Sequence, residues 1–183
     1  MGKDMSLCDR LRETQRDTGN PKFFEEALTE AFEKLGFDAE HKGGVNEPDI
    51  WLKILDYGIV IDAKTAEEPI GEARINFDAL ERYKENYRAD HVGVVAIGFS
   101  KGVVRDTAEK RGVTLIETEA ICKALENHMN YPYDPQHVYK MMFGGRGTVI
   151  TPDDIFPSTK DVSRLIEMIK RVLSDLNRLQ KSG

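Results

Sequence analysis

Cysteine and long apolar runs are both scarce in this 183-residue sequence. Its only cysteines, Cys8 and Cys122, are too few for a disulfide scaffold or a cysteine-rich zinc site, which fits a reducing compartment. No apolar run approaches the roughly 18 residues that a membrane span needs, and residues 1–13 lack the apolar centre of a signal peptide. We therefore expect a soluble, cytoplasmic protein that is neither exported nor membrane-bound.

Positive charge is also in short supply. The net charge of -6 at pH 7 argues against a protein that coats nucleic acid non-specifically, because phosphate binding usually rests on a basic surface. It does not exclude catalysis on DNA. Carboxylates gathered around a divalent cation carry local negative charge, and the cation supplies the missing positive charge.

The length allows one compact domain with extensions and is too short for two full-sized domains. We expect an N-terminal arm over residues 1–19, a core over residues 20–130 and a C-terminal extension over residues 131–183. The extension is predicted to end in an amphipathic helix near residues 161–179, which packs either on this domain or on another protomer. Its apolar stripe consists of Val162, Leu165, Ile166, Ile169, Val172, Leu173, Leu176 and Leu179.

Within the core, hydrophobic spacing predicts helices and strands in the order helix, three strands, helix, strand, helix, strand, helix. Three strands so close in sequence must form an antiparallel meander, and the apolar run at residues 92–97 suits a strand covered on both faces at the centre of the sheet. The predicted helices cover residues 21–35, 70–88, 101–111 and 119–128, and the predicted strands cover residues 37–41, 49–55, 57–63, 92–97 and 113–116.

Two acidic residues and a lysine fall at the ends of these strands, where charge is costly. Asp62 follows the apolar run Ile59-Val60-Ile61 directly, so its charge needs a partner or a metal ion. Side chains alternate along a strand, so Asp62 and Lys64 project to one face. Asp49 begins the neighbouring antiparallel strand and can lie beside Asp62. Hard oxygen ligands of this kind favour Mg²⁺ or Mn²⁺ over zinc.

Glu25 is the candidate for a fourth site residue. At about 100° per residue, it falls about 80° from the centre of the apolar stripe of the first core helix. The other acidic residues of this helix, Glu26, Glu30 and Glu33, point well away. Glu25 alone is therefore expected at the edge of the buried face, within reach of a site at the rim of the sheet.

The run Pro48-Asp49 followed by Asp62-Ala63-Lys64 resembles the PD-(D/E)xK nuclease signature. Its surroundings resemble the FokI-type cleavage domain of type IIS restriction endonucleases, from about residue 22 to residue 156. A Phe24-Glu25 pair and a Gly36-Phe37 pair at the two ends of the first core helix look similar to the Mrr-like branch. The other shared positions are His41, Gly43, Gly44, Asp56-Tyr57-Gly58, Pro69-Ile70-Gly71, Arg82-Tyr83 and Lys101-Gly102.

This resemblance implies an α/β (α+β) fold with a restriction-endonuclease-like core, a mixed β-sheet flanked by helices. It also implies an endonuclease that hydrolyses DNA phosphodiester bonds with Mg²⁺, for which Mn²⁺ can substitute. Asp49, Asp62 and Lys64 match the catalytic trio, and Glu25 matches a less constant position. Asp49, Asp62 and Glu25 are then the metal ligands. The expected partners are DNA and either a second copy of the chain or a separate recognition subunit or domain.

Other interpretations stay open at this point. Asp49 could form a turn, Asp62 and Lys64 a surface ion pair, and Glu25 could serve the helix dipole. His41 could be structural or contact a phosphate. Two alternative functions are a structure-specific repair or junction nuclease of the same superfamily, and a non-catalytic DNA-binding assembly subunit. The sequence departs from the FokI-type pattern between Gly71 and Arg82, which leaves the mode of dimerisation open.

Overall fold

The computed structural model describes residues 6–145, 147–157 and 166–173. Within these ranges, six strands form one mixed sheet in which the spatial order follows the sequence order. The strands are β1 (Asp38–His41), β2 (Ile50–Ile54), β3 (Tyr57–Lys64), β4 (His91–Ala96), β5 (Val113–Glu117) and β6 (Val149–Ile150).

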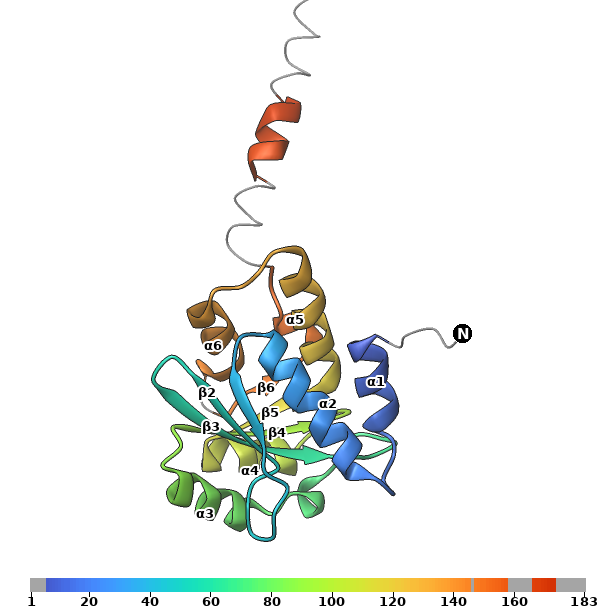
Figure 1. Cartoon of the computed structure of the whole chain (residues 1–183), viewed down its shortest axis with the longest axis vertical. Coiled ribbons are helices and arrows are strands. Elements are labelled where there is room, and N and C mark those ends of the chain that lie inside the picture. Colours follow the sequence, from blue (N-terminus) through green and yellow to red (C-terminus); the bar gives the residue numbers. More distant parts are fainter. Residues whose placement is uncertain (1–5, 146, 158–165, 174–183) are drawn as a thin grey trace, which may run out of the picture.

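Helices cover both faces of this sheet (Figure 1). One face carries α1 (Leu7–Thr14), α2 (Pro21–Lys34), α5 (Thr118–Asn130) and α6 (Pro135–Phe143), and the other carries α3 (Phe77–Tyr87) and α4 (Val103–Arg111). The domain also contains two short 3-10 turns, η1 (Glu72–Arg74) and η2 (Pro152–Asp154). This mixed sheet between helical layers confirms the predicted fold class.

The direction of each strand follows from the length of its connection. Short links join β1 to β2 and β2 to β3, so these strands form the antiparallel meander that the sequence predicts. Helices join β3 to β4 and β4 to β5, and both of these pairs are parallel, as crossover connections require. The apolar strand β4 lies between β3 and β5, which confirms its predicted central position.

Alternation along β3 separates the two hydrophobic clusters. Ile59 and Ile61 pack in the cluster beneath α1, α2 and α5, whereas Val60 packs in the cluster beneath α3 and α4. Because side chains alternate along a strand, Asp62 and Lys64 lie on the same side as Val60. The acidic end of β3 therefore lies on the side of the sheet that α3 and α4 cover.

The described part of the N-terminal segment is docked on the domain. Leu11 of α1 is fully buried, and Arg12 donates two hydrogen bonds to the carboxylate of Glu119 on α5, at 2.8 and 2.9 Å. After the helix, the carbonyl of Gln15 accepts the N–H of Ala66 at 2.8 Å. Helix α1 thus contacts both α5 and the segment that leaves β3.

Cys8 and Cys122 face each other across α1 and α5, although they are far apart in the sequence. The thiol of Cys8 lies 3.7 Å from the carbonyl oxygen of Cys122, and the thiol of Cys122 lies 3.9 Å from the carbonyl oxygen of Cys8. Both cysteines are free. The contact with Cys8, together with burial, raises the pKa of the Cys122 thiol, so this thiol stays protonated.

The predicted helix over residues 70–88 is shorter in the structure. Ile70 forms a bridge with Phe99, η1 follows, and α3 begins only after Asn76, whose side chain accepts the N–H of Ala79 at 3.1 Å. The helix ends at Arg88 in the left-handed conformation, with φ at 50°. A cap and a β-bridge therefore outweigh the helical spacing of residues 70–76.

Helix α6 and strand β6 lie in a stretch for which no element was predicted. Asp134 caps α6 by accepting the N–H of His137 at 2.9 Å, and Pro135 occupies its first turn. Strand β6 has only two residues and pairs with Leu115 and Ile116 of β5. Strand β6 forms the edge of the sheet beyond β5, whereas α6 packs over the face near β3 and β4.

Residues 166–173 form part of the predicted C-terminal helix, and the rest of that helix lies outside the described residues. Every residue of this segment is exposed, and Figure 1 shows it standing apart from the helical layers. Its exposed apolar side chains are Ile166, Met168, Ile169, Val172 and Leu173. None of the described helices is long and apolar enough to cross a membrane.

Candidate active site

Strand pairing brings Asp49 and Asp62 together. Ile50 of β2 lies opposite Ile61 of β3, so the antiparallel register places Asp49, one residue earlier, beside Asp62. The Oδ2 atom of Asp49 accepts the N–H of Ala63 at 2.7 Å. Lys64 Nζ donates to Asp62 Oδ1 at 2.8 Å. The structure thus gathers these three predicted site residues where β2 begins and β3 ends.

The site brings two carboxylates close together, with one ammonium group beside them. Burial, followed by the charge of Asp62, raises the pKa of Asp49 to about 7, and the charge of Glu25 adds to this effect. The N–H of Ala63 and the ammonium of Lys64 act in the opposite direction but are outweighed. Asp62 is itself only 8% exposed. Carboxylates held together in this way favour the arrival of a cation.

Glu25 extends from α2, which packs in the same cluster as Ile59 and Ile61, and its carboxylate is close enough to Asp49 for its charge to raise the pKa of that carboxyl. Its Oε2 atom is 2.7 Å from His41 Nε2, at the end of β1. In the described part of the chain, no group of three or more His, Cys, Asp or Glu side chains is placed to hold one metal ion. Glu25 therefore influences the cluster by its charge and is held by His41.

The donor chemistry of the cluster fits a hard divalent cation. Mg²⁺ in nucleotide- and nucleic-acid-processing sites is commonly held by one or two carboxylates, with water and substrate phosphate completing its shell. Asp49 and Asp62 supply two carboxylates from adjoining strands. The raised pKa of Asp49 is the observation that supports this fit, because a bound cation would offset the repulsion that raises it.

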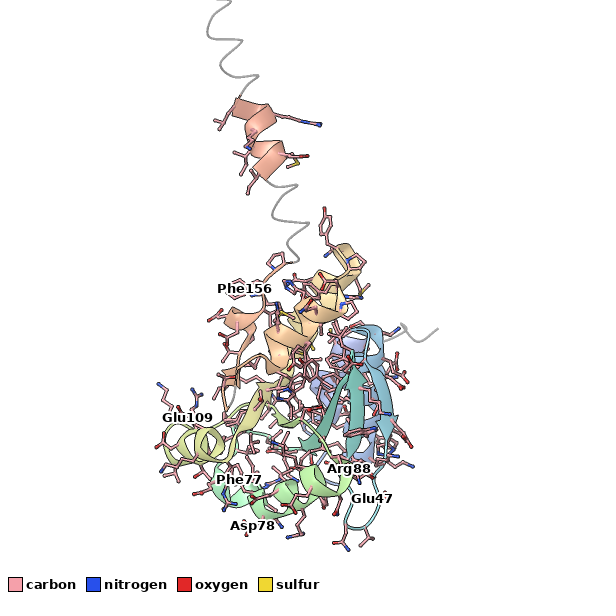
Figure 2. All side chains as sticks on the ribbon, turned by 90° about the vertical axis from the view of Figure 1, so that its left-hand side faces the viewer. Glu47, Phe77, Asp78, Arg88, Glu109 and Phe156 are labelled. Atoms are coloured by element: carbon pink, nitrogen blue, oxygen red, sulfur yellow. The ribbon has the colours of Figure 1, made fainter. Side chains whose placement is uncertain are left out.

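The segment that leaves the site is held by backbone contacts. The carbonyl of Thr65 accepts a hydrogen bond from Arg74 Nη2 at 3.0 Å, and the N–H of Ala66 donates to Gln15. Arg74 thus holds the chain next to Lys64. Residues 43–47, between β1 and β2, form an exposed loop. Figure 2 labels Glu47 in this loop, at the end of the molecule away from Phe156.

The contact between His41 and Glu25 was not foreseen from the sequence. Helical spacing predicts Glu25 at the edge of the buried face, and its side chain is 13% exposed. The sequence signal for its partner is weak. His41 ends a short strand just before Gly43-Gly44, and only the pairing of β1 with β2 shows that it faces α2.

Comparisons with known proteins agree with this geometry. The sequence matches the family model described as FokI, cleavage domain, over residues 6–148. The structure is similar to that of restriction endonuclease FokI, with a TM-score of 0.66 and 16% identity, covering 79% of this chain and 31% of that chain. FokI bound to DNA gives a TM-score of 0.64 with 16% identity, covering 77% of this chain and 30% of that chain.

A third similar structure is the small subunit of the heterodimeric restriction endonuclease R.BspD6I. Its TM-score is 0.56 with 16% identity, and the match covers 75% of this chain and 86% of that subunit. The chain thus spans less than a third of the FokI chains it matches and most of the small subunit. A search of curated proteins gave no significant match. With most of its residues matched by the family model and its fold shared with these enzymes, the chain belongs to the FokI cleavage domain family.

Proposed function

We propose that this chain is a divalent-cation-dependent endonuclease that hydrolyses DNA phosphodiester bonds, acting as a restriction-type cleavage domain or subunit. The observation that carries the proposal is the meeting of Asp49, Asp62 and Lys64 at the ends of β2 and β3, with the pKa of Asp49 raised to about 7. Membership of the FokI cleavage domain family supports it.

Each side chain has a role in this proposal. Asp49 and Asp62 would hold Mg²⁺, or Mn²⁺ in its place, with Glu25 adding negative charge nearby. When bound, the cation supplies positive charge for the phosphate and lowers the pKa of water. Lys64, held by Asp62, can donate hydrogen bonds to a phosphate oxygen or to the attacking water. In the reaction, water forms a new bond to phosphorus as one P–O bond of the phosphodiester breaks.

The test of this function is cleavage of plasmid, linear and branched DNA by the full chain, in Mg²⁺ and in EDTA. Nicking or cutting of plasmid and linear DNA in Mg²⁺, absent in EDTA, is the expected result. Cleavage that is strongly preferred on branched DNA would favour a repair or junction nuclease instead. DNA binding without cleavage in either Mg²⁺ or Mn²⁺ would support a non-catalytic assembly subunit and contradict the proposal.

We further propose that cutting of both DNA strands involves a second copy of the chain, because the described residues of one chain form one such site. The apolar side chains of residues 166–173 support pairing, since they are exposed and the apolar face of a helix is normally covered by a neighbour. The similar R.BspD6I small subunit comes from a heterodimer, so a separate recognition subunit is the alternative partner.

Ile169→Lys is expected to weaken this pairing, because it places a charge on the apolar face of the segment, where Ile169 is 50% exposed. We expect a loss of dimer in sedimentation velocity and a roughly tenfold slower conversion of nicked to linear plasmid, with nicking retained. Glu167→Lys, on an exposed acidic position of the same segment, is the matched control. An unchanged dimer in Ile169→Lys would exclude this surface.

A further inference from the structure

A partly buried hydrogen bond between Glu25 and His41 lies near the carboxylate cluster and joins two elements that the sequence separates. Glu25 extends from the first turns of α2, and His41 ends β1. Their side chains meet at 2.7 Å between Oε2 and Nε2, and they are only 13% and 23% exposed, respectively. The contact favours one rotamer of each side chain, because separating them would leave the Glu25 carboxylate without a hydrogen-bond donor in a partly buried place.

Gly43 leaves the space that this pair occupies. A Cβ atom at this position would lie 2.9 Å from both Cε1 and Nε2 of His41, and 3.5 Å from Glu25 Oε2. The residue also has a φ of +55°, which side chains rarely adopt. Any residue larger than glycine would therefore press on the His41 ring at the atom that contacts Glu25.

The position of Glu25 matters to the cluster because its charge is felt there. After burial and the charge of Asp62, the charge of Glu25 is the next factor that raises the pKa of Asp49. The backbone N–H of Lys42, the residue after His41, donates to the backbone carbonyl of Asp49 at 2.9 Å. A backbone hydrogen bond therefore also links the segment of His41 to the segment of Asp49. Moving the Glu25 carboxylate would thus change the field in which a cation is held.

We propose that His41 is a positioning residue that fixes the Glu25 carboxylate beside the Asp49–Asp62 cluster, and that Gly43 keeps the room for this contact. The inference rests on the proposed function, because the cluster is taken to hold a divalent cation. His41 acts through Glu25 and touches neither the cation nor the substrate. Partners that orient the groups of a metal site commonly change metal affinity by about 10–100-fold when removed.

The test is calorimetric titration of Mn²⁺ into the full chain, without DNA. His41→Ala should bind Mn²⁺ about tenfold more weakly than the wild type, because Glu25 loses its partner. His41→Gln keeps an N–H donor at a similar reach and should recover binding to within about threefold. Glu25→Gln should weaken Mn²⁺ binding as much as His41→Ala does. The double variant that carries both changes should bind Mn²⁺ no more weakly than either single variant. Glu26→Gln, on the next and exposed residue of α2, is the control.

Gly43→Ala is a second, independent test of the contact between His41 and Glu25. It should weaken Mn²⁺ binding about as much as His41→Ala does, and combining the two changes should add little. Gly71→Ala, where a Cβ atom would meet nothing within 4 Å, is its control.

The possible failures point to different conclusions. If the wild type binds Mn²⁺, Asp62→Asn removes that binding and His41→Ala leaves it unchanged, then only the role of His41 is wrong. The same conclusion follows if His41→Gln binds as weakly as His41→Ala, because the contact would then be merely structural. If the wild type binds no Mn²⁺, or if Asp62→Asn binds it normally, the proposed function itself fails, and this inference fails with it.

Discussion

Asp62→Asn is expected to lower the rate of metal-dependent DNA cleavage by at least about 10³-fold, which is roughly 4 kcal/mol of transition-state stabilisation. The change keeps the size of the side chain and an oxygen that can accept from Lys64 Nζ, so the fold should persist. It removes the charge that would hold the cation and orient Lys64. Plasmid nicking under single-turnover conditions in Mg²⁺ measures the effect.

Asp56→Asn is the matched control for this variant. Asp56 is exposed in the turn between β2 and β3, at the end of β3 opposite Asp62, and it also loses one carboxylate. Its cleavage rate should stay within about twofold of the wild type, because surface substitutions away from a site usually have small effects. Equal rates for Asp62→Asn and the wild type would remove this cluster from the reaction.

Asp49→Asn is expected to have opposite effects on stability and on cleavage. At pH 8 in EDTA, the wild type must keep the Asp49 carboxylate charged beside Asp62, although burial and that charge raise its pKa to about 7. The amide removes this repulsion and can still accept the N–H of Ala63. We expect a gain of roughly 2 kcal/mol in the free energy of unfolding, with cleavage reduced by about 10³-fold.

The stability difference should depend on pH in a defined direction. The pKa of Asp49 is higher in the folded state than in the unfolded chain, so the folded state keeps a proton that the unfolded chain has released. The stability that this proton contributes is fully present below the unfolded pKa and is lost as pH rises to about 7. The advantage of Asp49→Asn should therefore be small near pH 4 and largest above pH 7, since its amide does not titrate in this range.

Urea unfolding in EDTA at several pH values measures this difference, again beside Asp56→Asn. Saturating Mn²⁺ should stabilise the wild type more than Asp49→Asn, because only the wild type keeps both carboxylates of the site. A stability gain that is the same at pH 5 and pH 8 would contradict this origin of the effect. A variant less stable than the wild type at pH 8 would show that the contact with Ala63 outweighs the repulsion.

The core strands could be predicted because local pattern and short connections determine them. The apolar run of β4 suits only a strand covered on both faces. The short connections between β1, β2 and β3 leave few ways to pair these strands other than an antiparallel meander. Strand β6 could not be predicted, because its two residues are ordered only by pairing with β5. Helix α6 did carry a start signal in Asp134 and Pro135, but the surrounding Pro, Tyr and Gly residues masked it.

The sequence predicted the proximity of Asp49 and Asp62 within the hairpin, but not the neighbour of Glu25 outside it. The register of β2 and β3 follows from a short turn, so the nearness of Asp49 and Asp62 could be inferred. Helical spacing correctly placed Glu25 at the edge of a buried face. It could not tell which strand end α2 would approach, so the contact of Glu25 with His41 could not be predicted.

In the ion pair of Lys64 and Asp62, the lysine side chain is more exposed to solvent than the aspartate side chain. The lysine side chain is 26% exposed, whereas the aspartate side chain that it binds is 11% exposed. A polyanion that arrives from solvent would thus meet an ammonium group before it meets the carboxylates behind it. For a protein with a net charge of -6, an ammonium group at the entrance would lower the repulsion that a polyanion meets at these two carboxylates.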